Sequence, residues 1–491
     1  MPSFVLPIAI ALPVLGGAIL PLLPFKKNRS MHFYVETVVI LTSILVFCIL
    51  FNAPKETMNL IHFFGDLSIS FKLDGLGGVF AAMVAFLWPF VTLYSFEYMR
   101  HEEKEKGFFM FFTMTYGVTL GISMAANILT MYGFYEMLTL VTFPLVMHKG
   151  SREAVLASRK YLYYSLGGAA FAFIGMIFAI MYGSSTDFAF GGVLDLTAVG
   201  ERVGILRFVY VMAFMGFGVK TAIFPLDSWL PQAGVAPTPV TALLHAVAVV
   251  KAGAFAIIRL TYYLYGPEFI KGSWAQYVVM GLVIFTIVYG CSRAVKETHL
   301  KRRLAFSTVS NLSYILFGVT LMTPLGLVGA LCHMVFHAFM KILAFLCAGS
   351  VIVQSDKTFV HQLNGLGRKM PLVFGLFTVS SLALMGVPGL CGFVSKWNLA
   401  RAAVDSGNYL AYVGIMALLI SAMLTGIYTM TIVVRAFVLQ PEPEDEGYQK
   451  AKDPTWRMMI PLMIFAAVCV VFGVYSQPVV DYFITIAAGL I

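Results

Sequence analysis

Charged residues are scarce in this chain. Asp, Glu, Lys and Arg make up only 12% of its 491 residues, whereas 59% are hydrophobic. Because soluble domains are about 25% charged, this composition excludes a single soluble globular domain and indicates a polytopic membrane protein. The formal net charge is +9, but the basic residues lie in short loops between apolar runs. This distribution is typical of membrane topology, so we expect a lipid bilayer around the chain and no nucleic acid as a partner.

Paired cysteines and nucleotide-binding motifs are also lacking. The six cysteines are scattered through apolar stretches without a Cys-x-x-Cys spacing, which argues against zinc and iron–sulfur sites. We therefore expect no metal and no cofactor in this chain. The start of the chain lacks the basic stretch of a cleaved signal peptide, so it is predicted to remain as a first membrane helix.

Long apolar runs dominate instead, and they predict an all-α fold with about fourteen transmembrane helices. Spanning a bilayer takes about 20 residues, and stretches of this kind lie near residues 4–23, 31–53, 76–98, 108–126, 128–148, 158–182, 205–224, 238–264, 275–293, 303–322, 324–353, 372–399, 409–437 and 457–487. No linker is long enough to separate soluble domains, so we expect a single membrane domain over 1–491. The longest polar loop, about 439–456, is interpreted as a solvated connector.

Most of the Lys and Arg residues that do not lie within a membrane stretch are found in the loops after odd-numbered stretches. Examples are Arg29, Arg100 and Arg293. Cytoplasmic loops are enriched in these residues. This bias predicts that both termini lie outside the cytoplasm.

Four lysines interrupt the apolar stretches: Lys220, Lys251, Lys341 and Lys396. A lysine at the membrane centre costs roughly 3 kcal/mol on insertion scales, so it must be neutral, paired or in contact with a water-filled cavity. We therefore interpret all four as site candidates. Pro225 follows Lys220, and a Gly-Val-Pro-Gly motif precedes Lys396, which predicts that helices 7 and 12 are broken.

Glu136 is the acidic residue predicted deepest in a membrane stretch, and Lys220 is its natural partner. One hypothesis is an ion pair that opens and closes as protons move. The alternative is a static buried ion pair, which would add little net stability compared with an apolar replacement.

His333, His337 and Lys341 are spaced four residues apart and therefore share one helix face. Because neutral histidines pass protons near neutral pH, we predict a relay. Metal or haem ligation and simple helix packing are the alternatives. His245 and Lys251 are six residues apart and point to different faces of a regular helix, yet water or neighbouring helices could join them in one path.

Several other charges have a structural interpretation. Asp74 near an expected membrane surface is predicted to be structural, and Lys301, Arg302 and Arg303 to be cytoplasmic anchors. Asp227, in the turn after helix 7, is either structural or neutralises a charge of a neighbouring subunit.

Helices 7 and 12 resemble each other in combining a lysine with a helix breaker. The stretch that begins at Lys160 in helix 6 likewise resembles the stretch that begins at His337 in helix 11. We predict two inverted five-helix repeats, helices 4–8 over residues 108–265 and helices 9–13 over 274–437. Residues 1–107 would form helices 1–3, and 438–491 a loop and a C-terminal helix.

Several motifs carry a resemblance to a known family: KTAIFPLDSWLPQA from Lys220, APTPVTALLH ending at His245, LKRRLAFSTVS around Lys301, HMVFHAFMK from His333 to Lys341, and GFVSK ending at Lys396. Together they resemble the antiporter-like membrane subunits shared by respiratory complex I, Mrp cation/proton antiporters and group 4 membrane-bound hydrogenases. Two departures are His299, where the family often has aspartate, and Lys396, where one complex I paralogue has glutamate.

The resemblance implies Glu136 and Lys220 as a first pair, Lys251 as the central site, His333, His337 and Lys341 as links, and Lys396 as the outer site. We add His245 to the relay.

The expected function is proton translocation, with sodium coupling left open, in a redox-driven complex I-like or hydrogenase-like complex. The enzyme class stays undecided because this chain has no redox centre. We expect the protein to lie in the cell inner membrane or plasma membrane. Expected partners are paralogous or small membrane subunits and peripheral redox subunits, which would hold iron–sulfur clusters and nickel–iron, flavin or quinone. The alternative is a subunit of a Mrp-type secondary antiporter.

Overall fold

The computed structural model describes residues 2–52, 54, 56–63, 65, 67–441 and 445–490. The outer limits of the predicted domain, 1 and 491, and residues 442–444 of the predicted 438–491 segment lie outside the described residues.

Helices form nearly all of the described structure. They are α1 Val5–Ile19, α2 Asn28–Phe51, α3 Gly75–Tyr98, α4 Glu105–Ser123, α5 Ile128–Val146, α6 Arg152–Tyr182, α7 Leu196–Val199, α8 Val203–Gly218, α9 Trp229–Gln232, α10 Thr238–Ala246, α11 Val249–Ile258, α12 Pro267–Ile270, α13 Trp274–Lys296, α14 Leu300–Thr320, α15 Pro324–Ser355, α16 Leu366–Lys369, α17 Pro371–Met385, α18 Cys391–Asp405, α19 Tyr409–Phe437, α20 Glu446–Lys450, α21 Trp456–Val474 and α22 Gln477–Ala487. A π-helix, Arg259–Tyr265, continues α11.

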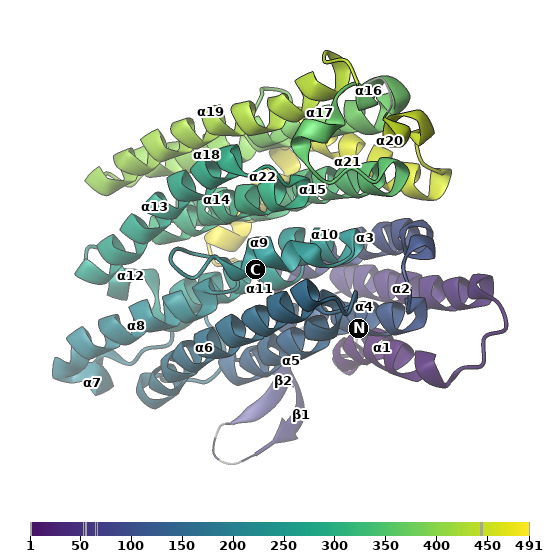
Figure 1. Ribbon diagram of the computed structural model, residues 1–491. Coiled ribbons are helices and arrows are strands. Elements are labelled where there is room, and N and C mark those ends of the chain that lie inside the picture. Colours follow the sequence, from purple (N-terminus) through teal and green to yellow (C-terminus); the bar gives the residue numbers. More distant parts are fainter. Residues whose placement is uncertain are drawn as a thin grey trace.

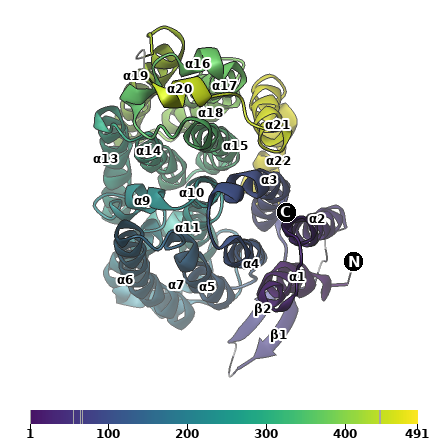
Figure 2. The same ribbon diagram turned by 45° about the vertical axis from the view of Figure 1, so that its right-hand side comes forward.

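The all-α membrane architecture is confirmed. In the described part of the chain, ten helical spans are long and apolar enough to cross a membrane. Each of the fourteen predicted stretches contains helix, but the count of fourteen crossings and the inverted repeats stay predictions. The long helices run roughly parallel and pack around α10, α11, α14 and α15, as Figures 1 and 2 show. The span 238–265 is entirely buried, and α15 nearly so.

A small β-hairpin was not predicted. Strand β1, Met58–His62, pairs antiparallel with β2, Ser68–Phe71. It projects from the helices near α5 (Figure 1), and the Ser70 N–H donates to Thr130 Oγ1 over 2.9 Å. The hairpin lies in a loop between two membrane stretches, where the search for long apolar runs gives no signal.

Three membrane segments are interrupted. Helix α8 ends at Gly218, and regular helix resumes only at Trp229. Helix α17 ends at Met385, and α18 begins at Cys391 after the predicted glycine-proline break. Both interruptions were predicted from the helix breakers. A third, unpredicted interruption separates α10 from α11 at 247–248.

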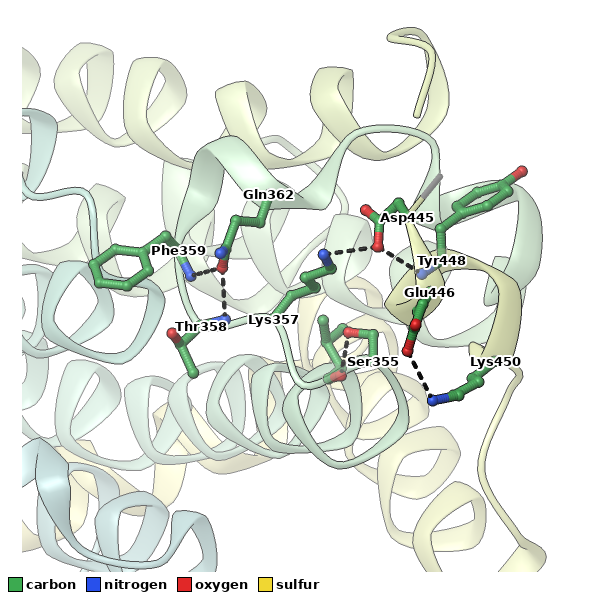
Figure 3. A network of polar contacts seen from close by, with 10 residues as sticks. Ser355, Lys357, Thr358, Phe359, Gln362, Asp445, Glu446, Tyr448 and Lys450 are labelled. Atoms are coloured by element: carbon green, nitrogen blue, oxygen red, sulfur yellow. Dashed lines mark hydrogen bonds and ion pairs between the residues drawn. The ribbon is translucent and has the colours of Figure 1, made fainter. Parts of the chain in front are cut away.

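The loop after α19 is attached to the end of α15 (Figure 3). Lys357 and Asp445 form an ion pair of 2.7 Å, and the Asp445 carboxylate also accepts from the Tyr448 N–H at the start of α20. The Gln362 Oε1 atom accepts from the Thr358 and Phe359 N–H groups over 3.2 and 3.1 Å. The described part of the loop is thus more structured than a plain connector.

Candidate functional site

Lys251 and His337 form the centre of a buried polar chain. Lys251 lies near the start of α11 and His337 in the middle of α15, and both side chains are fully buried. The Lys251 Nζ and His337 Nδ1 atoms are 2.9 Å apart in a hydrogen bond. The interruption before α11 places Lys251 just after a helix start, next to the face of α15 that carries the histidines.

The chain continues from His337 towards the break in helix 12. The rings of His337 and His333 stack with centroids 5.5 Å apart. The Nδ1 atom of His333 is hydrogen-bonded to Ser395 Oγ over 2.9 Å. Ser395 is the direct neighbour of Lys396, whose Nζ donates to the Leu384 and Met385 carbonyls over 2.7 and 2.8 Å. The break at the end of α17 therefore supplies the free carbonyl groups that hold this lysine.

Tyr314 of α14 lines the same passage. Its ring centroid is 4.9 Å from that of His333 and 5.4 Å from Lys396 Nζ. Tyr314 thus lies beside two predicted site residues, His333 and Lys396, and joins them.

Lys341 points away from this passage. Its Nζ donates to the Leu304 carbonyl over 3.1 Å and to Ser307 Oγ over 2.7 Å. Ser307 in turn is 2.5 Å from the hydroxyl of Tyr428 in a hydrogen bond. Lys341 therefore lies on the opposite side of His337 from His333, and not between the histidines and Lys396.

His245 is buried at the end of α10 and packs against Phe345 with ring centroids 5.0 Å apart. Neither of its ring nitrogens has a hydrogen-bond partner among the described residues. It interacts electrostatically with Lys341 and Lys301. His245 thus belongs to the same side of the chain as Lys341.

Lys220 and Glu136 are near one another without direct contact. The fully buried Lys220 donates to the Tyr135 carbonyl and lies over the Tyr135 ring, 3.3 Å from its centroid. The described ion pairs do not include Glu136 with Lys220, although the two charges interact electrostatically. Glu136 is only half-buried, on a side of α5 where Leu140 is exposed. The residue is thus partly exposed, although its Oε1 atom is buried without a hydrogen-bond partner among the described residues.

Sequence reasoning missed several members of the site. Ser395, Ser307 and Tyr314 are ordinary polar residues in membrane stretches and carry no spacing signal. The contact between Lys220 and α11 was also missed: a Cβ at Gly253 would lie 2.9 Å from the Cβ of Lys220. Only glycine lets the two segments approach so closely.

The predicted anchors at the start of α14 differ in exposure. Arg302 is partly exposed and pairs with Glu153 over 2.5 Å. Lys301 is buried and donates to the Ala236 carbonyl over 2.8 Å, and Arg303 is buried and donates to the Glu297 and Tyr428 carbonyls. All three therefore join α14 to other parts of the chain, Lys301 and Arg303 through buried contacts.

Two carboxylates with a structural interpretation differ in their partners. Asp74 caps α3 by accepting from the Gly77 N–H over 2.9 Å, and it pairs with Arg259. Asp227 is buried, and its Oδ2 atom has no partner among the described residues. Its two interpretations stay open.

In the described part of the chain, no group of three or more His, Cys, Asp or Glu side chains is placed to hold a metal ion. The expectation that the chain holds no metal and no cofactor stays a prediction.

The fold and the buried site define a polytopic membrane protein with an internal row of lysines and histidines. Residues 125–425 match the model of the NADH:quinone oxidoreductase/Mrp antiporter membrane family, and residues 61–109 match the N-terminal model of complex I chain 5. The chain belongs to the NADH:quinone oxidoreductase/Mrp antiporter family, and it is an antiporter-like membrane subunit. The resemblance seen in the sequence is confirmed.

Relatives carry subunit names from several kinds of complex. NADH-quinone oxidoreductase subunit N of Desulforudis audaxviator is 28% identical over 84% of this chain and 83% of its own length. F(420)H(2) dehydrogenase subunit L of Methanosarcina mazei is 29% identical over 94% and 70%. Na(+)/H(+) antiporter subunit A1 of Staphylococcus aureus is 27% identical over 95% and 61%.

Two solved structures share the fold. A chain of the archaeal membrane-bound sulfane sulfur reductase matches with a TM-score of 0.86 at 20% identity, covering 99% of this chain and 97% of that one. A chain of the Mrp complex from a Dietzia species matches with a TM-score of 0.85 at 21% identity and the same coverage.

Proposed function

We propose that this chain translocates protons as a membrane subunit of a redox-driven complex. The observation that carries the proposal is the unbroken series of contacts from Lys251 through His337, His333 and Ser395 to Lys396. Its members are fully buried up to Ser395. A static core would not need titratable groups in such a row, because each one costs free energy inside a membrane and such residues are kept mainly where they function.

In this mechanism Lys251 holds a proton at the centre of the membrane. It passes the proton to His337 Nδ1, and the stacked ring of His333 receives it next. The His333 Nδ1 atom is bonded to Ser395, which lies beside Lys396, the outer site. A neutral imidazole can accept a proton at one nitrogen and release one at the other, as each transfer requires.

Uptake would run through the other end of α15. Lys341 contacts Ser307 and Leu304 at the start of α14, and His245 lies beside it. With the predicted orientation these residues lie on the cytoplasmic side of Lys251. We therefore assign Lys341 and His245 to proton uptake and His333 to release.

Lys220 would couple this path to a neighbouring subunit. Its segment packs directly on Gly253, two residues from Lys251, and its Nζ rests on the residue next to Glu136. A charge brought to the half-buried Glu136 by a membrane partner would change the electrostatic attraction between Glu136 and Lys220. This change would alter the electrostatic environment of Lys251. Paralogous or small membrane subunits fit this role, whereas peripheral subunits would hold the iron–sulfur clusters and the nickel–iron, flavin or quinone groups.

The experiment compares Lys220→Ala with wild type in the purified complex, reconstituted into vesicles. Proton uptake is followed with a pH-sensitive dye while turnover of the driving reaction is measured. We expect proton uptake to fall at least tenfold. Lys452→Ala, which removes an exposed loop lysine, is the matched control. Normal pumping by an intact Lys220→Ala complex would refute the mechanism.

A Mrp-type secondary antiporter is the second candidate, favoured by the similarity to the Staphylococcus aureus antiporter subunit. The proteins that copurify with this chain decide between the two. Iron–sulfur proteins support the redox-driven complex, whereas small membrane proteins alone support the antiporter.

We further propose that this chain lies in the inner or plasma membrane, with both termini outside the cytoplasm. Labelling of a cysteine introduced at Ser3 from the outer side would test this orientation.

A further inference from the structure

A pocket of about 300 Å³ lies between the ends of three membrane helices, and none of its lining residues belongs to the lysine and histidine row. It is lined by Arg29 at the start of α2, Arg100 just after α3, and Arg457 at the start of α21. These helices lie side by side at one edge of the bundle (Figure 2). Three arginines from distant parts of the sequence thus line one pocket at one end of the membrane segments.

The positive charge of this pocket is only partly compensated. Arg100 pairs with Glu97 over 3.1 Å, but among the described residues no carboxylate pairs with Arg29 or Arg457. Glu105, which is nearby, is already hydrogen-bonded to Asn28 and His32. The backbone N–H groups at the starts of the long helices α2 and α21 add further attraction for an anion.

Aromatic and apolar side chains complete the pocket. Phe33 and Trp456 also line it and are 75% and 60% exposed, which is typical of aromatic residues at the boundary between lipid and water. Leu93 and Phe96 form part of the inner wall. A ligand that fits must therefore combine an anionic group with apolar chains.

Glu36 also lines the pocket, and its Oε2 atom has no hydrogen-bond partner among the described residues. It is seven residues beyond Arg29 on α2, which corresponds to about 10 Å at 1.5 Å per residue. This distance places the acidic group deeper in the membrane than the arginines. A phosphate held by the arginines would therefore be separated from the carboxylate.

We propose that this pocket binds the phosphodiester headgroup of an anionic phospholipid. The planar guanidinium groups of Arg29 and Arg457 would donate to the phosphate oxygens, and the acyl chains would lie along the seam of α2, α3 and α21. The proposal does not depend on proton translocation, because no residue of the pocket belongs to the proposed path.

The test is native mass spectrometry of the full chain in detergent with added phosphatidylglycerol or phosphatidylcholine of identical acyl chains. We expect retained phosphatidylglycerol on the wild type and little phosphatidylcholine. The variant Arg29→Gln/Arg100→Gln/Arg457→Gln should bind phosphatidylglycerol roughly a hundredfold more weakly, given the usual contribution of each basic residue to anionic lipid binding. If the triple variant does not fold, the double variant Arg29→Gln/Arg457→Gln replaces it, with a loss of about tenfold or more.

The matched control is Arg152→Gln/Arg159→Gln/Lys452→Gln, which removes the same charge from exposed positions that do not line the pocket. It should retain wild-type binding. Equal loss in the control, equal binding of both lipids, or undiminished binding by the pocket variants would overturn the proposal. Displacement of the lipid by millimolar inorganic phosphate would show a free-phosphate site instead. Absence of bound phosphatidylglycerol from the assembled complex would also overturn the proposal.

Discussion

Asp74 and Arg259 form a two-pronged ion pair across 185 residues of sequence. Arg259 Nη1 donates to Asp74 Oδ2 over 2.5 Å, and Nη2 donates to Oδ1 over 2.7 Å. Arg259 is 1% exposed, and its guanidinium lies over the rings of Phe188, Phe255 and Tyr263. The pair joins the start of α3 to the helix that carries Lys251, eight residues before Arg259.

Asp74→Asn should destabilise the protein by about 3–5 kcal/mol, because it leaves a buried guanidinium without its counter-charge. Thermal unfolding in detergent, monitored by tryptophan fluorescence, measures the change. Asp74→Asn/Arg259→Met should recover a large part of the loss, since the double variant leaves no unpaired charge. A double variant less stable than Asp74→Asn would contradict this explanation.

The same pair predicts a dependence on pH. Burial alone would raise the pKa of Asp74, but the charge and hydrogen bonds of Arg259 and the Gly77 N–H outweigh it and hold the pKa below its usual value. The ordinary aspartate pKa is about 3.9. Because the folded pKa is the lower one, the stabilisation is fully present above about pH 4 and is lost as the pH falls through the folded pKa. Wild type should therefore lose more stability than Asp74→Asn between pH 5 and pH 3, measured by unfolding temperature at each pH.

Gly253→Val should impair proton pumping although no titratable group is changed. Any Cβ at this position lies 2.9 Å from the Cβ of Lys220 and 3.0 Å from Thr221 Cγ2, so the two segments must separate. We expect pumping to fall to less than half of the wild-type value in reconstituted vesicles. Gly281→Val is the control, because a Cβ there meets no atom within 4 Å. Equal effects of both variants would show a general helix defect.

Ser395→Ala should slow proton release, because it removes the hydroxyl that joins His333 to the segment of Lys396. Loss of one neutral hydrogen bond is worth about 1 kcal/mol, which corresponds to a roughly fivefold slower step. The measurement is proton release under turnover. Ser381→Ala, at a buried serine whose hydroxyl donates within its own helix to the Phe377 carbonyl, should pump normally. Wild-type release by Ser395→Ala would exclude this serine from the path.

Much of the site could be predicted because a lysine inside an apolar stretch is conspicuous. Lys220, Lys251, Lys341 and Lys396, and the shared face of His333 and His337, follow from hydropathy and helical spacing. Helix breakers likewise indicated the interruptions beside Lys220 and Lys396.

Other features depend on contacts that no local pattern records. The interruption at 247–248 lies in Ala-Val-Ala-Val-Val, which contains no glycine or proline and so gives no local signal of a break. A helical wheel drawn through His245 and Lys251 is therefore misleading, since the two residues lie on separate helices. The position of Lys341 could not be foreseen either, because it depends on Ser307 and Leu304 of α14.

The π-helix Arg259–Tyr265 has a consequence for how related chains should be compared. A π-turn contains one more residue than an α-turn and is commonly a local bulge within an α-helix. Such a bulge absorbs an added residue without shifting the residues on either side. When relatives of this chain are aligned, a one-residue length difference is therefore expected within 259–265, with Lys251 before it and Gly266 after it remaining in register.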